Sequence, residues 1–288
     1  MKTTLSVIIY SMFFLYSVTA KSELALTQDI DYISESSYSE GRDLLDIYMP
    51  ASAEKVPVVV FFHGGALLFG DKTYGKPMAA SLVERGFGLV SANYRLSPNH
   101  AHPAHVQDAA AATAWVINNI AQYGGDPENV FIAGHSAGAY LAALLAVDPA
   151  LVEKHTMAKG AVKGAILMSP FLYVEETAPQ RIATKAVYKS IWGETKEAWL
   201  AASVTDFIGP GRDNILVMYA DGDDLWRKKQ NERFVRDLTS AGNFNVSAIE
   251  VKNRTHTTIL SNISAEDDQV SELMANFISK LGRTDKGK

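Results

Sequence analysis

Short apolar runs alternate with longer stretches of helical spacing along most of this chain. The runs are apolar on both faces, which is typical of strands buried between helical layers. They lie at residues 56–62, 87–95, 129–135, 164–171, 214–221 and 244–252. The helical stretches lie between or after them, at residues 77–85, 103–122, 137–147, 226–241 and 266–281. This alternation predicts an α/β fold with a mostly parallel central sheet and helices on both faces.

Two earlier segments complete the predicted sheet. Residues 26–33 and 44–50 have strand patterns with no helix between them, so they predict an antiparallel hairpin at the sheet edge and about eight strands in all. Residues 172–212 have no clear strand, and a helical excursion above the sheet is expected there. No repeat divides the chain, so residues 21–288 are expected to form a single domain.

The first residues have a different pattern. Lys2 is followed by an apolar stretch from Leu5 to Val18 and by a small-residue site that ends at Ala20. This pattern predicts a secretory signal peptide over residues 1–20, cleaved after about Ala20. Because the stretch is shorter than the about 20 residues of a membrane-spanning helix, we expect a secreted or periplasmic protein with no stable membrane insertion.

Composition excludes several classes of function. The 288-residue chain has a formal charge of −5 and no long basic run, which disfavours nucleic acid as a partner. It contains no cysteine, so disulfides, zinc–thiolate sites and thiol catalysis are excluded. The sequons at Asn245, Asn253 and Asn262 do not show whether glycans are attached. The oligomeric state is not determined by the sequence.

One serine lies where the chain is expected to turn sharply. Residues Gly134-His135-Ser136-Ala137-Gly138 match the pattern G-x-S-x-G between an apolar run and a helical stretch. Such a turn holds the serine in a strained backbone conformation and exposes its hydroxyl at the carboxyl end of the sheet. A packing turn of small residues is the alternative, and the strand–turn–helix order favours a nucleophile.

A serine hydroxyl becomes a good nucleophile when a base accepts its proton. Among the seven histidines, His256 follows the last apolar run and is the expected base. A carboxylate then orients the imidazole and stabilises its charge. Asp221, Asp223 and Asp224 end the preceding strand; Asp223 is the expected acid, Asp224 is the alternative, and the remaining aspartates are expected to be solvated turn residues.

Donors for an oxyanion are expected after the strand at 56–62. The loop His63-Gly64-Gly65-Ala66 is an HGGG-type element with alanine in the third glycine position. We expect three backbone N–H groups to form the oxyanion hole, those of Gly65, Ala66 and Ala137. The residues expected to line the substrate pocket, below the 172–212 excursion, are Gly64, Leu67, Phe69 and His135.

A histidine-rich loop offers a competing signal. Its possible metal ligands are His100, His102, His105 and Asp108. Short histidine clusters are weak evidence for a metal. We therefore expect a solvated loop leading into the next helix, with Pro103 in the first turn, and no metal or other cofactor.

Together these segments resemble an α/β-hydrolase of the esterase/lipase superfamily. The resemblance covers about residues 44–281 and rests on LLDIYMP, VVVFFHGGA, SANYRLSP, YGGDPENVFIAGHSAGAYLAALL, YADGDD and the final histidine, in the family's order. The chain is similar to carboxylesterase-like and hormone-sensitive-lipase-like enzymes, and to the feruloyl-esterase-like and kynurenine-formamidase-like branch. The resemblance implies acyl hydrolysis through an acyl-serine intermediate, without a cofactor.

The sequence therefore predicts an exported serine carboxylesterase acting on small-molecule esters with small to medium acyl groups. The second hypothesis is an amide or formamide hydrolase, which would use the same reactive residues. A non-catalytic binding protein on a hydrolase fold is the third, and the intact set of reactive residues disfavours it.

Overall fold

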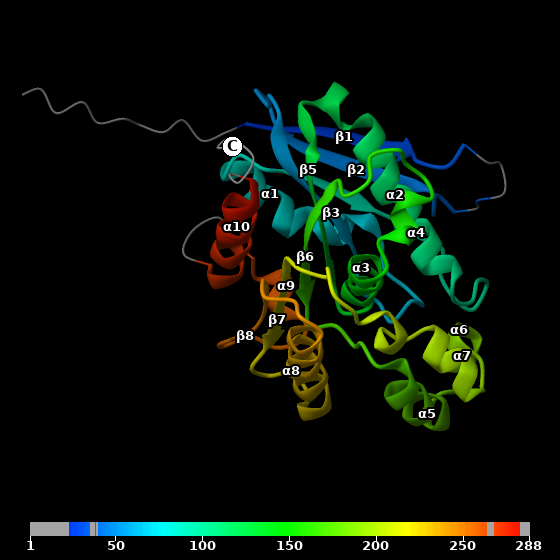
Figure 1. The fold of residues 1–288 in the computed structure, drawn as a ribbon. Helices are drawn as coiled ribbons and strands as arrows, with labels where there is room; N and C mark the ends of the chain where they lie inside the picture. The colour runs from blue at the N-terminus through cyan, green and yellow to red at the C-terminus, as the bar shows by residue number, and fades with distance from the viewer. Residues whose placement is uncertain (1–22, 35–37, 39, 264–267, 283–288) are drawn as a thin grey trace, which may run out of the picture.

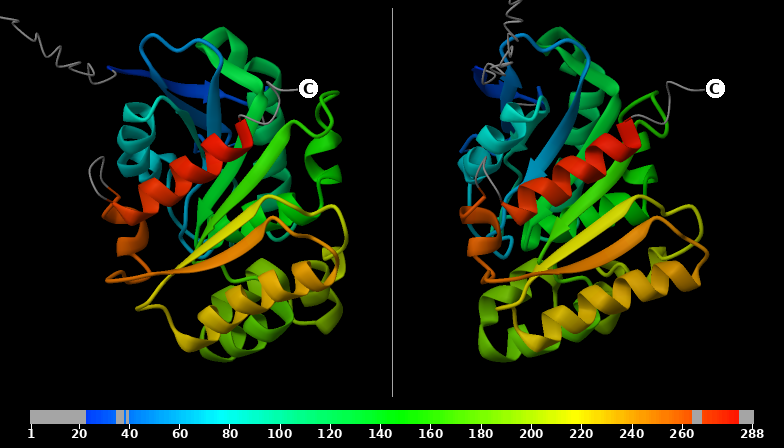
Figure 2. Two further views of the ribbon diagram at one scale, coloured as in Figure 1. Left: turned by 60° about the vertical axis from the view of Figure 1, so that its left-hand side comes forward. Right: turned by 90° about the vertical axis from the view of Figure 1, so that its left-hand side faces the viewer.

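The computed structural model describes residues 23–34, 38, 40–263 and 268–282. An eight-stranded sheet runs through these residues, with helices packed against both faces (Figures 1 and 2). The strands, in chain order, are β1 (Leu24–Asp31), β2 (Leu44–Pro50), β3 (Val56–Phe62), β4 (Gly88–Ala92), β5 (Gly125–His135), β6 (Val162–Met168), β7 (Ile215–Ala220) and β8 (Val246–Val251). The segment predicted as a signal peptide lies outside the described residues.

The strand order across the sheet is β1-β2-β4-β3-β5-β6-β7-β8. β1 pairs antiparallel with β2, and β2 pairs antiparallel with β4, whereas every later pairing is parallel. The predicted fold class, a mostly parallel sheet of about eight strands with an antiparallel hairpin at one edge, is therefore confirmed. The central strands are apolar on both faces because helices cover them on each side.

The longer helices divide between the two faces of the sheet. They are α1 (Lys76–Glu84), α2 (Ala104–Asn119), α3 (Ala137–Val147), α8 (Leu225–Ser240) and α10 (Gln269–Gly282). α1 and α10 pack with alternate strand residues in one core cluster, and α2, α3 and α8 pack with the others in a second cluster (Figure 2). Within the described ranges, no helix is both long and apolar enough to cross a bilayer.

The chain leaves the sheet between β6 and β7. The elements there are α5 (Val174–Thr184), η3 (Ala186–Tyr188), α6 (Lys189–Trp192), α7 (Lys196–Ala201) and η4 (Thr205–Phe207). They lie together beside α3 and α8 (Figure 1), in the segment where the sequence predicts a helical excursion. The aromatic rings of Phe171 and Tyr140 stack at a centroid distance of 4.6 Å and attach this segment to α3.

The parallel strands bring distant parts of the sequence to one edge of the sheet. The register pairs His135 of β5 with Met168 of β6, and Met168 with Met218 of β7. Ala220 of β7 in turn pairs with Val251 of β8. The loops that follow β5, β7 and β8 therefore start at neighbouring points, where open α/β sheets bind ligands.

Candidate active site

Ser136 occupies a sharp turn between β5 and α3. Its φ of 52° and ψ of −112° lie in a region that residues with a side chain rarely adopt. The turn is tight because α3 packs directly on β3: a Cβ atom on Gly138 would lie 1.9 Å from the carbonyl oxygen of Phe62. The backbone N–H of Ser136 donates to the carbonyl of Met168 over 2.8 Å, which fixes the turn to β6.

Three side chains predicted to act together form a continuous hydrogen-bonded row. His256 Nε2 lies 2.9 Å from Ser136 Oγ, and His256 Nδ1 lies 2.7 Å from Asp223 Oδ1. Because an ionised carboxylate can only accept, Nδ1 carries the proton and Nε2 is free to accept the serine proton. The arrangement has the geometry of a nucleophile, a general base and an orienting carboxylate.

The Asp223 carboxylate is buried but well supplied with donors. Ser169 Oγ donates to Oδ2 over 2.5 Å, and the Ala220 N–H donates to the same oxygen over 2.9 Å. Burial alone would raise the pKa of Asp223, but the hydrogen bonds from His256 and Ser169 hold it below its usual value. Asp223 is therefore ionised at neutral pH and can stabilise a positive charge on His256.

The neighbouring aspartates have other partners. Asp224 is exposed, lies at the start of α8 and accepts a hydrogen bond from Trp226 Nε1 over 3.3 Å. Asp221 accepts from the N–H groups of Asn253 and Arg254 over 3.0 and 2.9 Å. Asp221 lies in a turn and is partly exposed, as expected, and its carboxylate in addition fixes the loop that leads to His256.

Two supporting residues lie outside the predicted catalytic set. Ser169, just after β6, has a φ of 50° and directs its hydroxyl to Asp223. Arg227, one turn into α8, donates from a guanidinium N–H to the Ser169 carbonyl over 2.7 Å, and its Nε lies 3.6 Å from Asp223 Oδ1. The spacing of four residues between Asp223 and Arg227 is a signal in the sequence, but only the fold shows that Ser169 joins them.

The loop after β3 presents backbone donors near the serine. Among the described residues, the N–H groups of Gly65, Ala66 and Ala137 donate no hydrogen bond to the protein. Gly65 has a φ of 126°, and a Cβ there would lie 1.9 Å from the Phe69 carbonyl oxygen. Ala66 has a φ of 55°, in the left-handed region that favours the glycine of an HGGG element. These N–H groups are available to an oxyanion.

The buried side chain of His63 stabilises this loop. Its ring stacks on Tyr94 at a centroid distance of 4.3 Å, and its Nδ1–H donates to the Gly64 carbonyl over 2.7 Å. The Tyr94 hydroxyl donates to the His63 carbonyl over 2.7 Å. Complete burial lowers the pKa of His63 to about 4, so the ring is neutral and acts as a packed spacer.

Ser136 lines a pocket with a volume of about 800 Å³. Its lining residues are Gly64, Gly65, Ala66, Phe69, Thr73, Tyr74, Pro77, His135, Ser136, Arg181, Gly222, Asp223, Asp224, Arg227, His256, Thr257, Leu260 and Ser261. The predicted pocket residues Gly64, Phe69 and His135 are among them. Leu67 is not: the expectation is wrong because its side chain is fully buried in the main core. The 172–212 excursion contributes Arg181 alone.

The histidine-rich segment has two parts. Residues 98–103 form a loop that is exposed or half-buried, as expected, whereas His105 and Asp108 lie in α2 and are buried. Asp108 forms an ion pair of 2.7 Å with Arg95, and His105 Nε2 lies 3.2 Å from Ser97 Oγ. Burial lowers the pKa of His105 to about 3 and that of His102 to about 4. Nowhere in the described ranges do three or more His, Cys, Asp or Glu side chains form a group able to hold a metal ion.

Comparisons with known proteins agree with this geometry. The BD-FAE family matches residues 45–238 of the chain. Esterase LipQ of Mycobacterium tuberculosis is 31% identical over 273 residues, which are 86% of this chain and 62% of LipQ. Kynurenine formamidase of Danio rerio is 28% identical over 270 residues, 91% of this chain and 85% of that protein.

A solved structure shows the same fold. A truncated carbohydrate esterase from gut microbiota superimposes with a TM-score of 0.73 at 21% identity, over 91% of this chain and 97% of that one. This likeness supports the α/β-hydrolase fold predicted from the sequence. The chain spans less than two thirds of the length of LipQ.

Proposed function

We propose that this chain, which belongs to the BD-FAE family of α/β-hydrolases, is a serine carboxylesterase acting on small to medium acyl esters. The observation that carries the proposal is the row of hydrogen bonds from Ser136 through His256 to Asp223, with distances of 2.9 and 2.7 Å. Acyl transfer also requires donors for the oxyanion and space for the substrate. The free N–H groups beside this row serve as the donors, and the adjoining pocket provides the space.

The first half of the reaction forms an acyl-serine. Ser136 Oγ attacks the ester carbonyl carbon while its proton passes to His256 Nε2, and the carbonyl oxygen gains a negative charge. The N–H groups of Gly65, Ala66 and Ala137 stabilise this oxyanion. When the tetrahedral centre collapses, the bond to the alcohol oxygen breaks, and His256 gives its proton to that oxygen.

The second half releases the acid. A water molecule attacks the acyl carbon while His256 takes its proton, and a second oxyanion forms in the same place. Collapse breaks the bond to Ser136 Oγ, which regains a proton from His256. Asp223 stays ionised throughout and stabilises each transient imidazolium.

The pocket wall supports an apolar acyl group of limited size. Phe69, Tyr74, Pro77 and Leu260 supply an apolar surface next to the serine. Volumes of this order are typical of pockets that enclose a small molecule.

An exported location forms part of the proposal and rests on the pattern of residues 1–20. The mature protein is then expected to begin at Lys21, which N-terminal sequencing of secreted material checks.

A second candidate function is hydrolysis of an amide or formamide. The similarity to a kynurenine formamidase over 91% of this chain favours it specifically. The same serine, histidine and oxyanion donors serve both reactions, since both form a tetrahedral intermediate. Matched esters and anilides of one acid distinguish the two functions by their relative kcat/KM.

The proposal is tested with p-nitrophenyl esters from acetate to laurate. Wild type should hydrolyse the shorter esters, and Ser136→Ala should lower kcat by at least about a thousandfold. Ser240→Ala, on the exposed end of α8, is the matched control and should retain full activity. Equal activity of wild type and Ser136→Ala would show that the serine assignment is wrong. Inactivity of wild type towards every ester would exclude esterase function and leave amide hydrolysis or binding.

A further inference from the structure

Two arginines lie beside one another in the wall of the pocket that holds Ser136. Arg181 comes from α5 and Arg227 from α8. Both guanidinium groups approach the ring of Trp226, with Cζ atoms 5.8 and 4.6 Å from its centroid. One part of the pocket wall is therefore positively charged, whereas Phe69 and Leu260 make other parts apolar.

The two arginines differ in what they bind. Arg227 is nearly buried and donates to the Ser169 carbonyl, so it belongs to the support of Asp223. Arg181 is only half-buried and donates to the hydroxyl of Tyr188 over 3.1 Å, with Cζ 5.3 Å from that ring. In the part of the chain that the structure describes, Arg181 forms no ion pair with a carboxylate. Its guanidinium contacts the neutral rings of Tyr188 and Trp226, and the nearby Arg227 carries the same charge.

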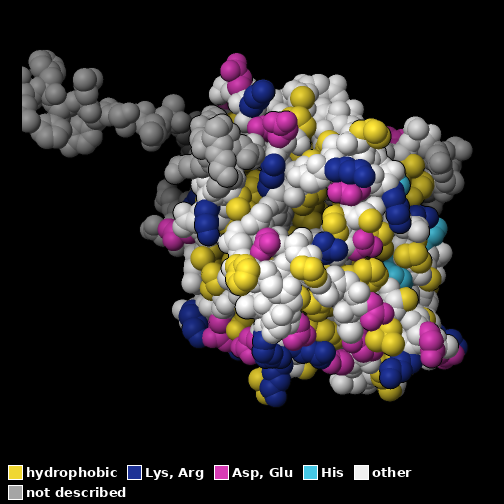
Figure 3. Space-filling view, viewed as in Figure 1, with side chains coloured by type: hydrophobic (Ala, Val, Ile, Leu, Met, Phe, Trp, Pro, Cys, Tyr) yellow, Lys and Arg dark blue, Asp and Glu magenta, His cyan; other side chains and the backbone are white. Residues whose placement is uncertain are grey.

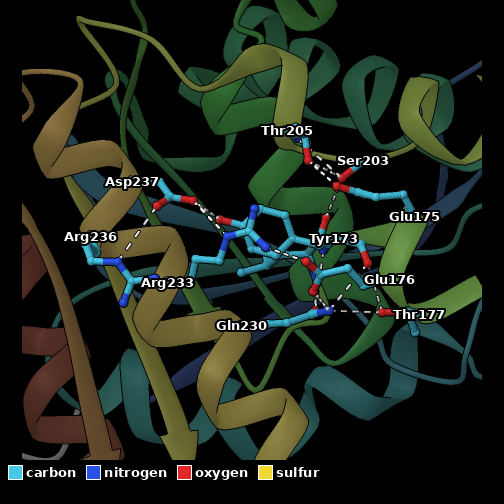
Figure 4. A network of polar contacts seen from close by, with 11 residues as sticks. Tyr173, Glu175, Glu176, Thr177, Ser203, Thr205, Gln230, Arg233, Arg236 and Asp237 are labelled. Atoms are coloured by element: carbon cyan, nitrogen blue, oxygen red, sulfur yellow. Dashed lines mark hydrogen bonds and ion pairs between the residues drawn. The ribbon is translucent and has the colours of Figure 1, made fainter.

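The position of Arg181 is fixed by the start of its helix. Figure 4 shows the polar network that joins the first turn of α5 to α8 and η4. In this network Glu176 pairs with Arg233 and accepts from Gln230 over 3.3 Å, while Glu175 accepts from Thr205 over 2.6 Å. Arg181 follows on the same short helix, so its backbone is fixed. The contacts of its guanidinium with Tyr188 and Trp226 place that group at the pocket wall.

Two other arginines of this region, Arg233 and Arg236, lie close to carboxylates. Arg233 binds Asp237 over 3.2 Å in addition to Glu176, and Arg236 lies 4.0 Å from Asp237. On the face shown in Figure 3, basic and acidic side chains are likewise interspersed around α8. Arg181 lines both an adjoining groove and the serine pocket, and it is not part of a broad basic surface.

The carboxylates that line the pocket leave this charge available. Asp223 is occupied by His256, Ser169 and the Ala220 N–H, and its side chain is 1% exposed. Asp224 binds the Trp226 indole and lies at the amino-terminal end of α8, whose dipole favours a negative charge. Neither forms an ion pair with Arg181.

We propose that Arg181 binds an anionic group, most simply a carboxylate, carried by the ester substrate. This inference rests on the proposed esterase function and names its substrate class. A guanidinium matches a carboxylate with two parallel N–H donors, and partial burial strengthens the attraction over that of an exposed pair. The carboxylate belongs either to the acyl part or to the alcohol part, and the same recognition serves both.

Two pairs of substrates test the inference. Mono-4-nitrophenyl adipate is compared with 4-nitrophenyl hexanoate, which places the charge on the acyl side. The acetate ester of 4-hydroxybenzoate is compared with that of 4-hydroxybenzamide, which places it on the alcohol side. In one pair, wild type should prefer the anionic ester, and Arg181→Gln should lower the ratio of kcat/KM values about tenfold. The neutral ester should be hydrolysed as before.

The controls separate recognition from structural damage. Lys229→Gln removes the same charge from the adjoining groove, which Lys229 lines without lining the serine pocket, and should leave both ratios unchanged. Arg181→Lys keeps the charge and should keep part of the preference. An equal loss on both members of each pair, or ratios that Arg181→Gln does not alter, would overturn the inference while esterase function stands. Wild type inactive on the neutral esters as well would instead overturn the proposed function.

Discussion

The ring of His135 donates a hydrogen bond from Nε2 to the backbone carbonyl of His256 over 2.6 Å. His135, the residue before the proposed nucleophile Ser136, thus holds the loop of the proposed base His256, and the centroids of the two histidine rings lie 4.9 Å apart. Burial, followed by the nearby His256, lowers the pKa of His135 to about 4. His135 is therefore neutral when His256 becomes positively charged, so its ring adds no positive charge that would oppose that step.

Removing the hydrogen bond between His135 and the His256 carbonyl should make the position of the His256 imidazole less well fixed. We expect His135→Phe to lower kcat about tenfold with little change in KM, because the loop that carries His256 loses its anchor. His135→Gln, whose amide can donate to the same carbonyl, should restore part of the loss. Steady-state kinetics on a short p-nitrophenyl ester measure both variants. A role limited to packing would give the opposite order, with Phe at least as active as Gln.

Asp223 and Asp224 are adjacent in sequence but should differ strongly in effect. Asp223→Asn reverses the hydrogen bond to His256 Nδ1 and should lower kcat by about 10⁴. Asp224→Asn should change kcat by less than about threefold, since its carboxylate is exposed and accepts its hydrogen bond from the indole of Trp226, not from His256. Comparable losses in the two variants would refute the assignment of Asp223 as the orienting acid.

Gly138 is expected to tolerate no side chain. In Gly138→Ala the new Cβ would lie 1.9 Å from the Phe62 carbonyl oxygen, so α3 must move away from β3. We expect the free energy of unfolding to fall by about 3 kcal/mol and the esterase activity to be largely lost. Gly209→Ala is the matched control, because a Cβ there meets nothing within 4 Å. Urea unfolding curves and activity assays on both variants provide the comparison.

His105 should make the protein sensitive to acid. Its pKa is lowered to about 3 by burial, helped by the charges of His102 and Arg95. An unfolded chain takes up this proton near its ordinary pKa of about 6.5, whereas the folded protein does so only near the lowered value. Stability from this residue is therefore complete above about pH 6.5 and is lost as the pH falls towards 3.

The variant His105→Leu should remove this sensitivity. Between pH 7 and pH 4, wild type should lose about 3 kcal/mol of unfolding free energy through this residue, and His105→Leu should lose correspondingly less. Ser97, the partner of His105, keeps a hydrogen bond to the His100 carbonyl over 2.5 Å. Urea unfolding at the two pH values tests the prediction, with exposed His155→Leu as a control that should behave as wild type.

The sheet and the row of reactive residues could be predicted because each has a local signature. Buried parallel strands are apolar on both faces, so β3 is predicted with the bounds the structure gives, Val56–Phe62. Ser136 and His256 directly follow strands or the short loops after them, and parallel strands bring such positions together. The strained conformation expected at Ser136 is also observed.

The supporting contacts could not be predicted because they depend on tertiary packing. Ser169 lies 54 residues from Asp223 in sequence, and nothing near Ser169 indicates the contact. The sequence predicts Leu67 in the pocket, but the side chain of a residue directly after the oxyanion loop can face either solvent or core, and here it faces the core. Similarly, the burial of His105 depends on how Arg95 and Asp108 pair, which fixes the loop against α2.

The length of chain between the reactive residues has a consequence for how the protein is made. Ser136 and His256 are 120 residues apart, and their contact requires β8 to be paired with β7 at the far end of the sheet. Contacts between residues so distant in sequence form late, since the loop between them must first be closed. In refolding from urea, catalytic activity should therefore return no earlier than the fluorescence of buried Trp192. A nascent chain acquires its base only after His256 has been synthesised. The appearance of catalytic activity therefore reports that the sheet has assembled as far as β8.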